Sequence, residues 1–333
     1  MMFLANRRRR QLSLALAATL FAGSGVATAA PVAAPAASNP APALQASLDA
    51  FAKRAQPATL GVAVIDLNSG ATWGVNASQA FPMMSDFKAP VAAAILARID
   101  AGAMSLTQTV ELARADIIPG SAVPSIGSKF QGERMRFTVA ELMRAAVTES
   151  DNTAVDALLV LLGGPARFTE FMRSKGVAHM VATENERGLT RYTLAQRAAP
   201  AGSTLAPPPN STTPAASALF LKTLWANKLL SPGSTAYLLD MMYAQVIPTR
   251  LRRGLPPGAR LADKTGTAGV IHGKGSFNDM GLFTWPDGRA VIVTVYLTGS
   301  TASQDEMETL FGDIARTATT ALAPPAATAA AAQ

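Results

Sequence analysis

Four short segments of the chain contain the residue types that covalent acyl transfer requires. They are Ser85-Asp86-Phe87-Lys88, Ser150-Asp151-Asn152, Glu186-Arg187-Gly188-Leu189 and Lys264-Thr265-Gly266-Thr267. A serine hydroxyl is a weak nucleophile until a neighbouring base accepts its proton, and water needs a base to release the resulting ester. Serines, lysines and a carboxylate in this order predict a serine acyl-transfer site with a hydrolytic base.

The first segment pairs a candidate nucleophile, Ser85, with a candidate base, Lys88. Ser85 precedes the apolar run 89–97, so we expect it in the first turn of a buried helix. Lys88, three residues on, then lies on the same helix face. Unpaired N–H groups at a helix start also favour an oxyanion. A serine three residues before a lysine is common by chance, so this segment gains meaning only from the others.

The second segment lies between two predicted helices, over 139–148 and 153–162. Ser150 can pass a proton to a leaving group, and Asn152 offers a donor and an acceptor to a substrate amide. The alternative interpretation is structural, because Asp151 or Ser150 can cap the helix that follows.

The fourth segment is typical of an edge strand close to a ligand. Gly266 permits close backbone approach. Lys264 and Thr265 can bind a substrate carboxylate, and the N–H of Thr267 can complete an oxyanion hole. A solvated edge strand protected by a lysine is the structural alternative.

Together, the Ser-x-x-Lys, Ser-Asp-Asn and Lys-Thr-Gly motifs are the signature of class A β-lactamases and penicillin-binding proteins. The sequence resembles the class A serine β-lactamase family over residues 44–319. Asn210-Ser211-Thr212-Thr213-Pro214 and Gly254-Leu255-Pro256-Pro257-Gly258 extend the resemblance. It implies that Ser85 forms an acyl-enzyme with a small-molecule β-lactam, without a cofactor or metal. Whether Lys88 or Glu186 is the acylation base stays open.

The resemblance also implies that Glu186 activates the deacylating water. In the family this glutamate begins a Glu-x-x-Leu-Asn pattern within a loop. Glu186-Arg187-Gly188-Leu189-Thr190 matches all but the last place. Glu184 is a competing candidate, but it has no leucine in register.

The chain departs from the family pattern at several places. Asp86 stands where threonine is usual, and Thr190 replaces the asparagine that helps to hold the water. Glu184 and Asn210 occupy the positions of an Arg–Asp ion pair and cannot form one. The stretch 198–209 is longer than usual, which predicts a looser loop and slow deacylation. The segment 117–132 is also longer, and we expect it at the mouth of the site.

Two alternative functions share most of these motifs. A D,D-peptidase or transpeptidase of peptidoglycan would need no Glu186 and would stay acylated by penicillin. A non-hydrolytic relative would bind β-lactams or cell-wall peptides as a sensor.

Composition excludes other chemistries. The 333 residues include no cysteine and only two histidines, His179 and His272. Disulfides, thiol nucleophiles and Cys-ligated zinc are therefore excluded, and a His-rich metal site is not expected. A hydrophobic fraction of 49% supports a sizeable core.

The N-terminus has the form of an export signal. Four arginines, residues 7–10, precede an apolar stretch over 12–22, and Ala27-Thr28-Ala29 suits cleavage before Ala30. A retained membrane anchor is the alternative, and export could follow the twin-arginine or the ordinary route. Removing the four arginines lowers the net charge from +7 to about +3. We therefore expect a periplasmic or secreted monomer with no nucleic-acid partner and no membrane contact after cleavage.

These segments need a fold that brings distant parts of the chain together. Strands are predicted over 60–67, 72–75, 280–285 and 290–297, and helices over 44–55, 89–101, 166–175, 214–227 and 304–319. This order predicts an α+β fold, with an antiparallel sheet flanked by terminal helices and an inserted all-α lobe. We expect a signal peptide over 1–29, an Ala/Pro linker over 30–42, a catalytic domain over 43–322 and an Ala/Pro tail over 323–333. The α/β lobe would comprise 43–88 and 250–322 and the helical lobe 89–249, with the site in a cleft between them.

Overall fold

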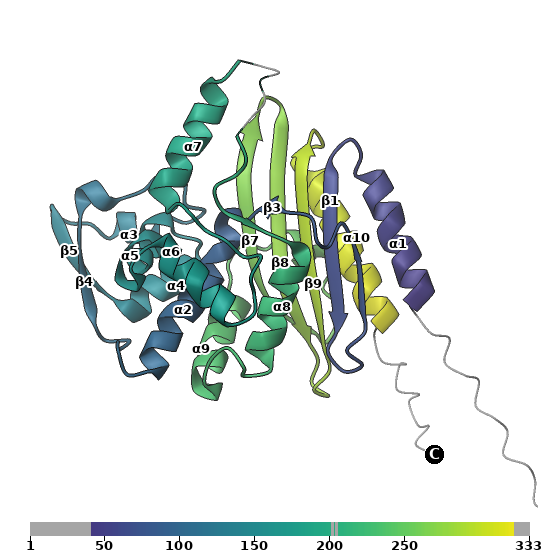
Figure 1. Cartoon of the computed structure of the whole chain (residues 1–333), viewed down its shortest axis with the longest axis horizontal. Helices are drawn as coiled ribbons and strands as arrows, with labels where there is room; N and C mark the ends of the chain where they lie inside the picture. The colour runs from purple at the N-terminus through teal and green to yellow at the C-terminus, as the bar shows by residue number, and fades with distance from the viewer. Residues whose placement is uncertain (1–40, 201–202, 204–205, 323–333) are drawn as a thin grey trace, which may run out of the picture. The chain divides into compact units, whose positions relative to one another are not determined.

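The computed structural model describes residues 41–200, 203 and 206–322 (Figure 1). The predicted signal peptide, most of the linker and the tail lie outside these residues. Within the described part of the chain, no helix is long and apolar enough to cross a membrane.

Five antiparallel strands form the main sheet, in the order β2-β1-β9-β8-β7. Their bounds are Thr59–Asp66 for β1, Thr72–Val75 for β2, Arg260–Ile271 for β7, Lys274–Thr284 for β8 and Ala290–Ser300 for β9. The first and last parts of the chain therefore meet where β1 pairs with β9. The predicted antiparallel sheet is confirmed, and β7, which carries Lys264, is one of its two edge strands.

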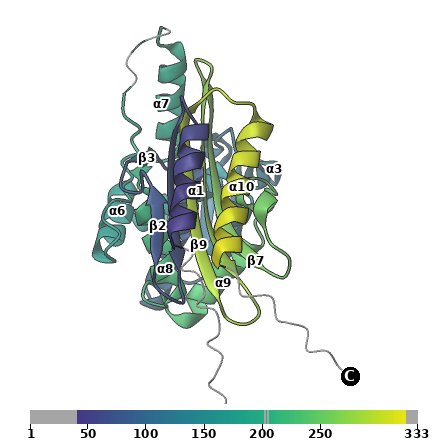
Figure 2. The ribbon, with the colours of Figure 1, turned by 90° about the vertical axis from the view of Figure 1, so that its right-hand side faces the viewer.

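Two terminal helices cover one face of this sheet. They are α1 (Ala41–Arg54) and α10 (Gln304–Leu322), which lie side by side in Figure 2. Leu48 of α1 and Phe311 of α10 are fully buried and pack in one cluster with the strands. Removing this apolar surface from water stabilises the packing of α1 and α10 against this face of the sheet.

The helical block contains the predicted helices. They are α2 (Lys88–Asp100), α4 (Val139–Thr148), α5 (Asn152–Leu162), α6 (Pro165–Ser174) and α8 (Pro214–Trp225). α4 begins with a capping box, because Thr138 accepts the N–H of Glu141 and the Glu141 carboxylate accepts the N–H of Thr138. Ala93, Leu142 and Leu158 lie fully or almost fully buried in the core of this block.

Several elements were not predicted from the sequence. They are the strand pairs β3 (Phe81–Pro82) with β6 (Ser211–Thr212) and β4 (Thr109–Ala113) with β5 (Arg134–Thr138), and the helices α3 (Ser125–Ser128), α7 (Glu186–Ala198) and α9 (Pro232–Tyr243). The helix α7 matters most, because the resemblance pointed to a loop there. Asn185 caps it, with its side-chain oxygen 2.9 Å from the N of Gly188.

Candidate functional site

Ser85 lies in a single 3₁₀ turn, Met84–Phe87, that runs directly into α2. We predicted Ser85 in the first turn of the α-helix. It lies instead in the 3₁₀ turn just before that helix, because the α-helix begins only at Lys88. Met84 has a φ of 51°, a left-handed backbone that is rare outside glycine and that bends the chain before Ser85. Ser85 remains partly exposed, whereas Phe87 is fully buried and meets the ring of Phe168 edge-on.

Lys88 connects three of the four segments. Its side chain is fully buried, and Nζ donates to the Ser150 carbonyl at 2.8 Å and to Asn152 Oδ1 at 2.5 Å. Glu186 Oε1 lies 3.2 Å from the same Nζ as an ion pair. A buried ammonium is stable only with such partners, so their positions are strongly coupled.

The hydroxyl of Ser150 lies between two ammonium groups. Lys264 Nζ donates to Ser150 Oγ at 3.0 Å, and Lys88 Nζ is 3.4 Å from the same atom. Ser150 also has a φ of 58°, a strained conformation that occurs preferentially at functional sites. Burial, together with the nearby charge of Lys88, lowers the pKa of Lys264 to about 7.

Asp151 and Asn152 have structural partners. Asp151 caps α5, because its carboxylate accepts the N–H of Ala154 at 2.9 Å, so the structural alternative is confirmed for this residue. Asn152 Nδ2 donates to the Pro119 carbonyl at 2.9 Å. With Oδ1 on Lys88, one N–H of the amide and one lone pair remain for a ligand.

Gly266 allows the edge strand to lie against the turn before Ser85. A Cβ at this position would lie 2.1 Å from Asn278 Oδ1 and 2.9 Å from the Met83 carbonyl oxygen. The close approach that we predicted is thus made to the protein's own backbone. Thr265 is buried beside it, and Thr267 is exposed.

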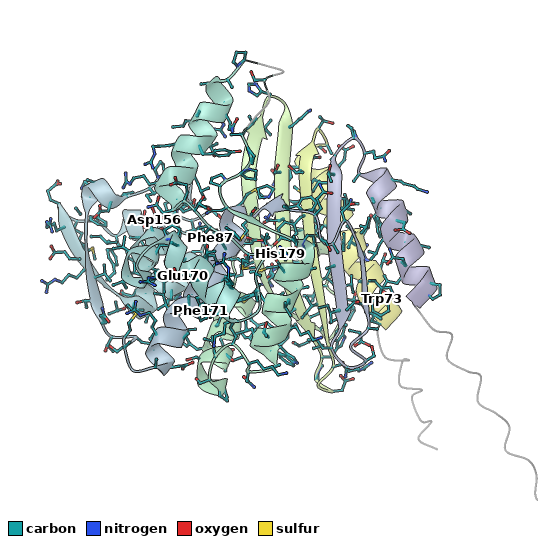
Figure 3. The ribbon with its side chains drawn as sticks, in the orientation of Figure 1. Trp73, Phe87, Asp156, Glu170, Phe171 and His179 are labelled. Atoms are coloured by element: carbon teal, nitrogen blue, oxygen red, sulfur yellow. The ribbon has the colours of Figure 1, made fainter. Side chains whose placement is uncertain are left out.

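Glu186 is the first residue of α7, and Asp156 of α5 holds this helix start. The Asp156 carboxylate accepts the N–H of Glu186 at 2.7 Å and that of Arg187 at 3.2 Å. Burial raises the pKa of Asp156 to about 6, although these two bonds act to lower it. Asp156 lies in the helical block (Figure 3), and no sequence signal distinguished it from other helical acids.

The side chain of Thr190 faces back along α7. Its Oγ1 donates to the Glu186 carbonyl at 2.9 Å. The hydroxyl proton is therefore already used, and only the lone pairs of the oxygen remain for a water molecule. Leu189, the leucine of the Glu-x-x-Leu pattern that favoured Glu186 over Glu184, packs against the core.

An amide replaces the missing ion pair at the base of the segment 181–211. Asn210 Oδ1 accepts the N–H groups of Thr183 and Glu184, each at 3.0 Å, and Nδ2 donates to the Glu184 carbonyl at 2.8 Å. The carboxylate of Glu184 lies 3.8 Å from Arg191, away from the Lys88 ion pair. Amide hydrogen bonds, rather than an ion pair, therefore join the two ends of the segment. Slow deacylation stays a prediction.

Arg250 belongs to the site although its sequence position did not predict this. This residue is 5% exposed and has a φ of 59°. It donates to the carbonyls of Gly266 at 3.0 Å and Asn278 at 2.8 Å, and also to Thr267 Oγ1. Burial lowers its pKa, and Asp279 opposes that shift. Nothing in the sequence distinguished it from its neighbours Arg252 and Arg253 as a contact of β7.

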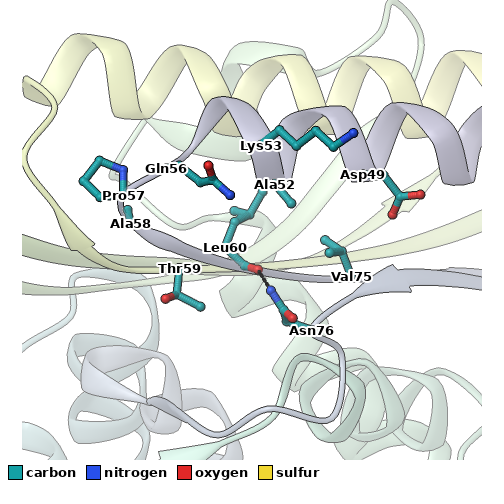
Figure 4. Close-up of a pocket in the computed structure, with 10 residues that line it drawn as sticks. All are labelled: Asp49, Ala52, Lys53, Gln56, Pro57, Ala58, Thr59, Leu60, Val75 and Asn76. Atoms are coloured by element: carbon teal, nitrogen blue, oxygen red, sulfur yellow. Dashed lines mark hydrogen bonds between the residues drawn. The ribbon is translucent and has the colours of Figure 1, made fainter.

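Two pockets on the surface of the described residues do not include Ser85, Lys88, Ser150 or Lys264. One, of about 710 Å³, lies between α1 and the strands β1 and β2 and includes Lys53 and Asn76 (Figure 4). Another, of about 340 Å³, lies between α4 and α9. The expected cleft between two lobes stays a prediction.

Comparisons with known proteins identify the family of the chain. A profile of the beta-lactamase enzyme family matches residues 42–322. The chain is 33% identical to the extended-spectrum beta-lactamase PER-1 of Pseudomonas aeruginosa, over 78% of this chain and 82% of that protein. It is 34% identical to the carbapenem-hydrolyzing beta-lactamase KPC of Klebsiella oxytoca, over 77% and 82%.

Solved structures show the same fold. An ancestral class A beta-lactamase of Gram-negative bacteria superposes with a TM-score of 0.72 and 38% identity, over 84% of this chain and 99% of the other. A beta-lactamase from Chitinophaga pinensis gives a TM-score of 0.74 with 29% identity, over 83% and 97%.

The buried carboxylate of Asp156 predicts a pH-dependent stability. Its pKa of about 6 in the folded protein exceeds the ordinary value of 3.8, so folding takes up protons between these values. The contribution of this group to the free energy of unfolding is therefore larger at low pH and falls as the pH rises through about 6. Replacing Asp156→Asn should remove that fall, on the order of 1 kcal/mol between about pH 5 and about pH 7.5.

Urea unfolding of the parent protein and the variant at both pH values measures this difference. Asn retains one acceptor oxygen, so the variant keeps one of the two hydrogen bonds to α7. Equal changes of stability with pH in the two proteins would contradict the assignment.

Proposed function

The chain belongs to the beta-lactamase enzyme family and is a class A enzyme that hydrolyses β-lactam antibiotics, and from this premise we propose how its residues divide the reaction. Hydrolysis of the lactam ring is the basis of the resistance that such an enzyme gives. The observation that carries the proposal is the hydrogen-bonded array in which Lys88 and Lys264 share the hydroxyl of Ser150 and Glu186 lies 3.2 Å from Lys88.

Ser85 is the nucleophile that attacks the lactam carbonyl. It is the partly exposed residue of a turn whose neighbours Asp86 and Phe87 are buried. Lys88 and Glu186 form one ion pair beside this turn, so a proton taken by either group stays within the pair. Acylation makes a bond from Ser85 Oγ to the carbonyl carbon and breaks the bond to the lactam nitrogen.

Ser150 passes a proton to the departing lactam nitrogen. Its hydroxyl contacts both ammonium groups, so a proton that it gives up can be replaced from Lys88 or Lys264. Asn152 lies beside it and holds the acyl side chain of the substrate through its free N–H. The N–H of Thr267 completes the oxyanion hole.

The carboxylate of the substrate binds along β7. Lys264 and Thr265 present a charge and a hydroxyl there, and Gly266 lets the strand lie close to Asn278 and the Met83 carbonyl. Arg250 adds a second positive charge behind Thr267, whose Oγ1 it contacts. Guanidinium groups stay charged at any physiological pH, so this contribution does not titrate.

Glu186 activates the water that releases Ser85. Its place at the start of α7, fixed by Asp156, sets the carboxylate next to Lys88. A D,D-peptidase would not need this carboxylate, and a sensor would need neither the carboxylate nor a proton relay. The array therefore favours turnover over permanent acylation or simple binding.

The enzyme acts outside the cytoplasm, in the periplasm or in secreted form, as a monomer. The basic and apolar residues over 7–22 and the small residues over 27–29 support export with cleavage before Ala30.

The proposed nucleophile predicts a specific covalent adduct. Residues 30–333, mixed with a chromogenic cephalosporin, should hydrolyse it continuously, because the ester on Ser85 is released by water. Replacement Ser85→Ala should abolish turnover and the adduct seen by intact-protein mass spectrometry. A burst of one equivalent with a lasting adduct would instead identify the peptidase chemistry.

The proposed base predicts a trapped intermediate. Replacement Glu186→Gln keeps the shape but removes the carboxylate, so deacylation should slow by roughly 10²–10⁴-fold while the adduct on Ser85 accumulates. Glu184→Gln is the matched control, because Glu184 precedes α7 by two residues and its carboxylate lies 3.8 Å from Arg191. Accumulation with Glu184→Gln rather than Glu186→Gln would reverse the assignment.

The lowered pKa of Lys264 predicts an alkaline limit. Its ammonium loses the proton as the pH rises through about 7, and with it the charge that binds the substrate carboxylate. The value of kcat/KM should then fall about tenfold for each pH unit above that value. Lys264→Arg should shift the limb to higher pH, since its guanidinium stays protonated. Identical normalised pH profiles for the two proteins would exclude Lys264 as the source.

A further inference from the structure

Asp86 is a buried acid that the reaction described above does not use. It directly follows Ser85, and it is 0% exposed. Its Oδ2 accepts a hydrogen bond from the Tyr296 hydroxyl. Its Oδ1 is buried and has no hydrogen-bond partner among the described residues.

The contact with Tyr296 belongs to a chain of hydroxyl groups beneath the nucleophile turn. The Tyr296 oxygen lies 2.7 Å from Ser217 Oγ, which lies 3.2 Å from Thr212 Oγ1. These residues come from β9, α8 and β6 respectively. The ring of Tyr296 also packs 5.8 Å from that of Phe81, which precedes the turn. The turn is thus attached to the centre of the sheet by contacts that do not involve the lysines.

The surroundings of Asp86 favour its uncharged form. An ionised carboxylate here would bury a charged oxygen without a hydrogen bond, which is costly. Among the described residues, no cation lies within ion-pair distance of this carboxyl group. Burial raises the pKa of Asp86 well above its ordinary value, and Asp279 adds to that effect, although Tyr296 and Lys264 act in the opposite direction.

We propose that Asp86 is a positioning residue, a neutral carboxylic acid that binds Tyr296 and thereby fixes the turn that presents Ser85. The inference rests on the proposed role of Ser85. The family's usual threonine carries its hydroxyl oxygen one bond nearer the backbone than an aspartate oxygen. Asp86 therefore reaches a partner in the sheet at a distance that a threonine side chain does not span.

Three substitutions separate position from charge. Asp86→Asn keeps the shape and an acceptor oxygen for Tyr296, and it is uncharged at every pH. Asp86→Leu keeps a similar volume without an acceptor. Tyr296→Phe keeps the ring and removes only the hydroxyl that Asp86 binds. Ser217→Ala is the matched control, because it changes the next link of the chain and leaves the contact between Asp86 and Tyr296 intact.

The measurement is the rate of acylation of Ser85 in single-turnover experiments with a chromogenic cephalosporin, together with KM and the pH profile. Urea unfolding first establishes a temperature at which every variant is folded. Asp86→Leu and Tyr296→Phe should slow acylation by about tenfold or more with little change in KM, since small misplacement of a reacting group is costly. Asp86→Asn and Ser217→Ala should acylate within about threefold of the parent, and Asp86→Asn should leave the pH profile unchanged.

Two results would overturn the proposal. Parent-like acylation by Tyr296→Phe and Asp86→Leu would show that the contact does not position the turn. A shift of the alkaline limb to lower pH in Asp86→Asn would show that Asp86 is ionised and supports the charge of Lys264. Failure of the proposed function itself looks different, because the parent protein would then form no adduct on Ser85.

Discussion

The burial of one ammonium group organises the rest of this site. Lys88 is fully buried, and a charge removed from water must find compensating partners within the protein. It finds them in the carbonyl of Ser150, the amide of Asn152 and the carboxylate of Glu186. These groups come from the α4–α5 connection and from the start of α7, so satisfying Lys88 fixes the relative positions of three chain segments that are far apart in sequence.

Three of the six described non-glycine residues with a positive φ lie at or beside the same place. Met84, Ser150 and Arg250 all have left-handed backbone conformations, and each lies next to or within the array. Such conformations cost of order 1–3 kcal/mol each and persist only where the surrounding contacts determine them. Beside Met84, Asn278 Nδ2 donates to the carbonyls of Pro82 and Met83. Ser150 is held by the two lysines and Arg250 by its three hydrogen bonds. These contacts offset the local backbone strain and fix the positions of the three residues.

The departures from the family pattern have physical consequences that can now be separated. Asn210 closes the base of the segment 181–211 with amide hydrogen bonds, so the absence of an ion pair does not leave that base open. The Thr190 hydroxyl donates its proton to the Glu186 carbonyl. It can therefore only accept a hydrogen bond from the water used for deacylation. Asp86 makes a contact with the sheet through Tyr296. These changes lie on different elements of the fold.

Residues close together in the chain were enough to predict the chemistry and most of the framework. Four segments of recognisable spacing identified the candidate residues, and apolar periodicity predicted the terminal strands and most helices, because both depend on residues close in the chain. Only the tertiary structure decided which groups meet. Arg250 and Asp156 gave no local signal, since their roles come from partners on β7 and α7. The helix α7 was not predicted, because the family pattern indicated a loop at these residues. The burial that shifts the pKa values of Lys264 and Asp86 likewise exists only once distant layers have packed over them.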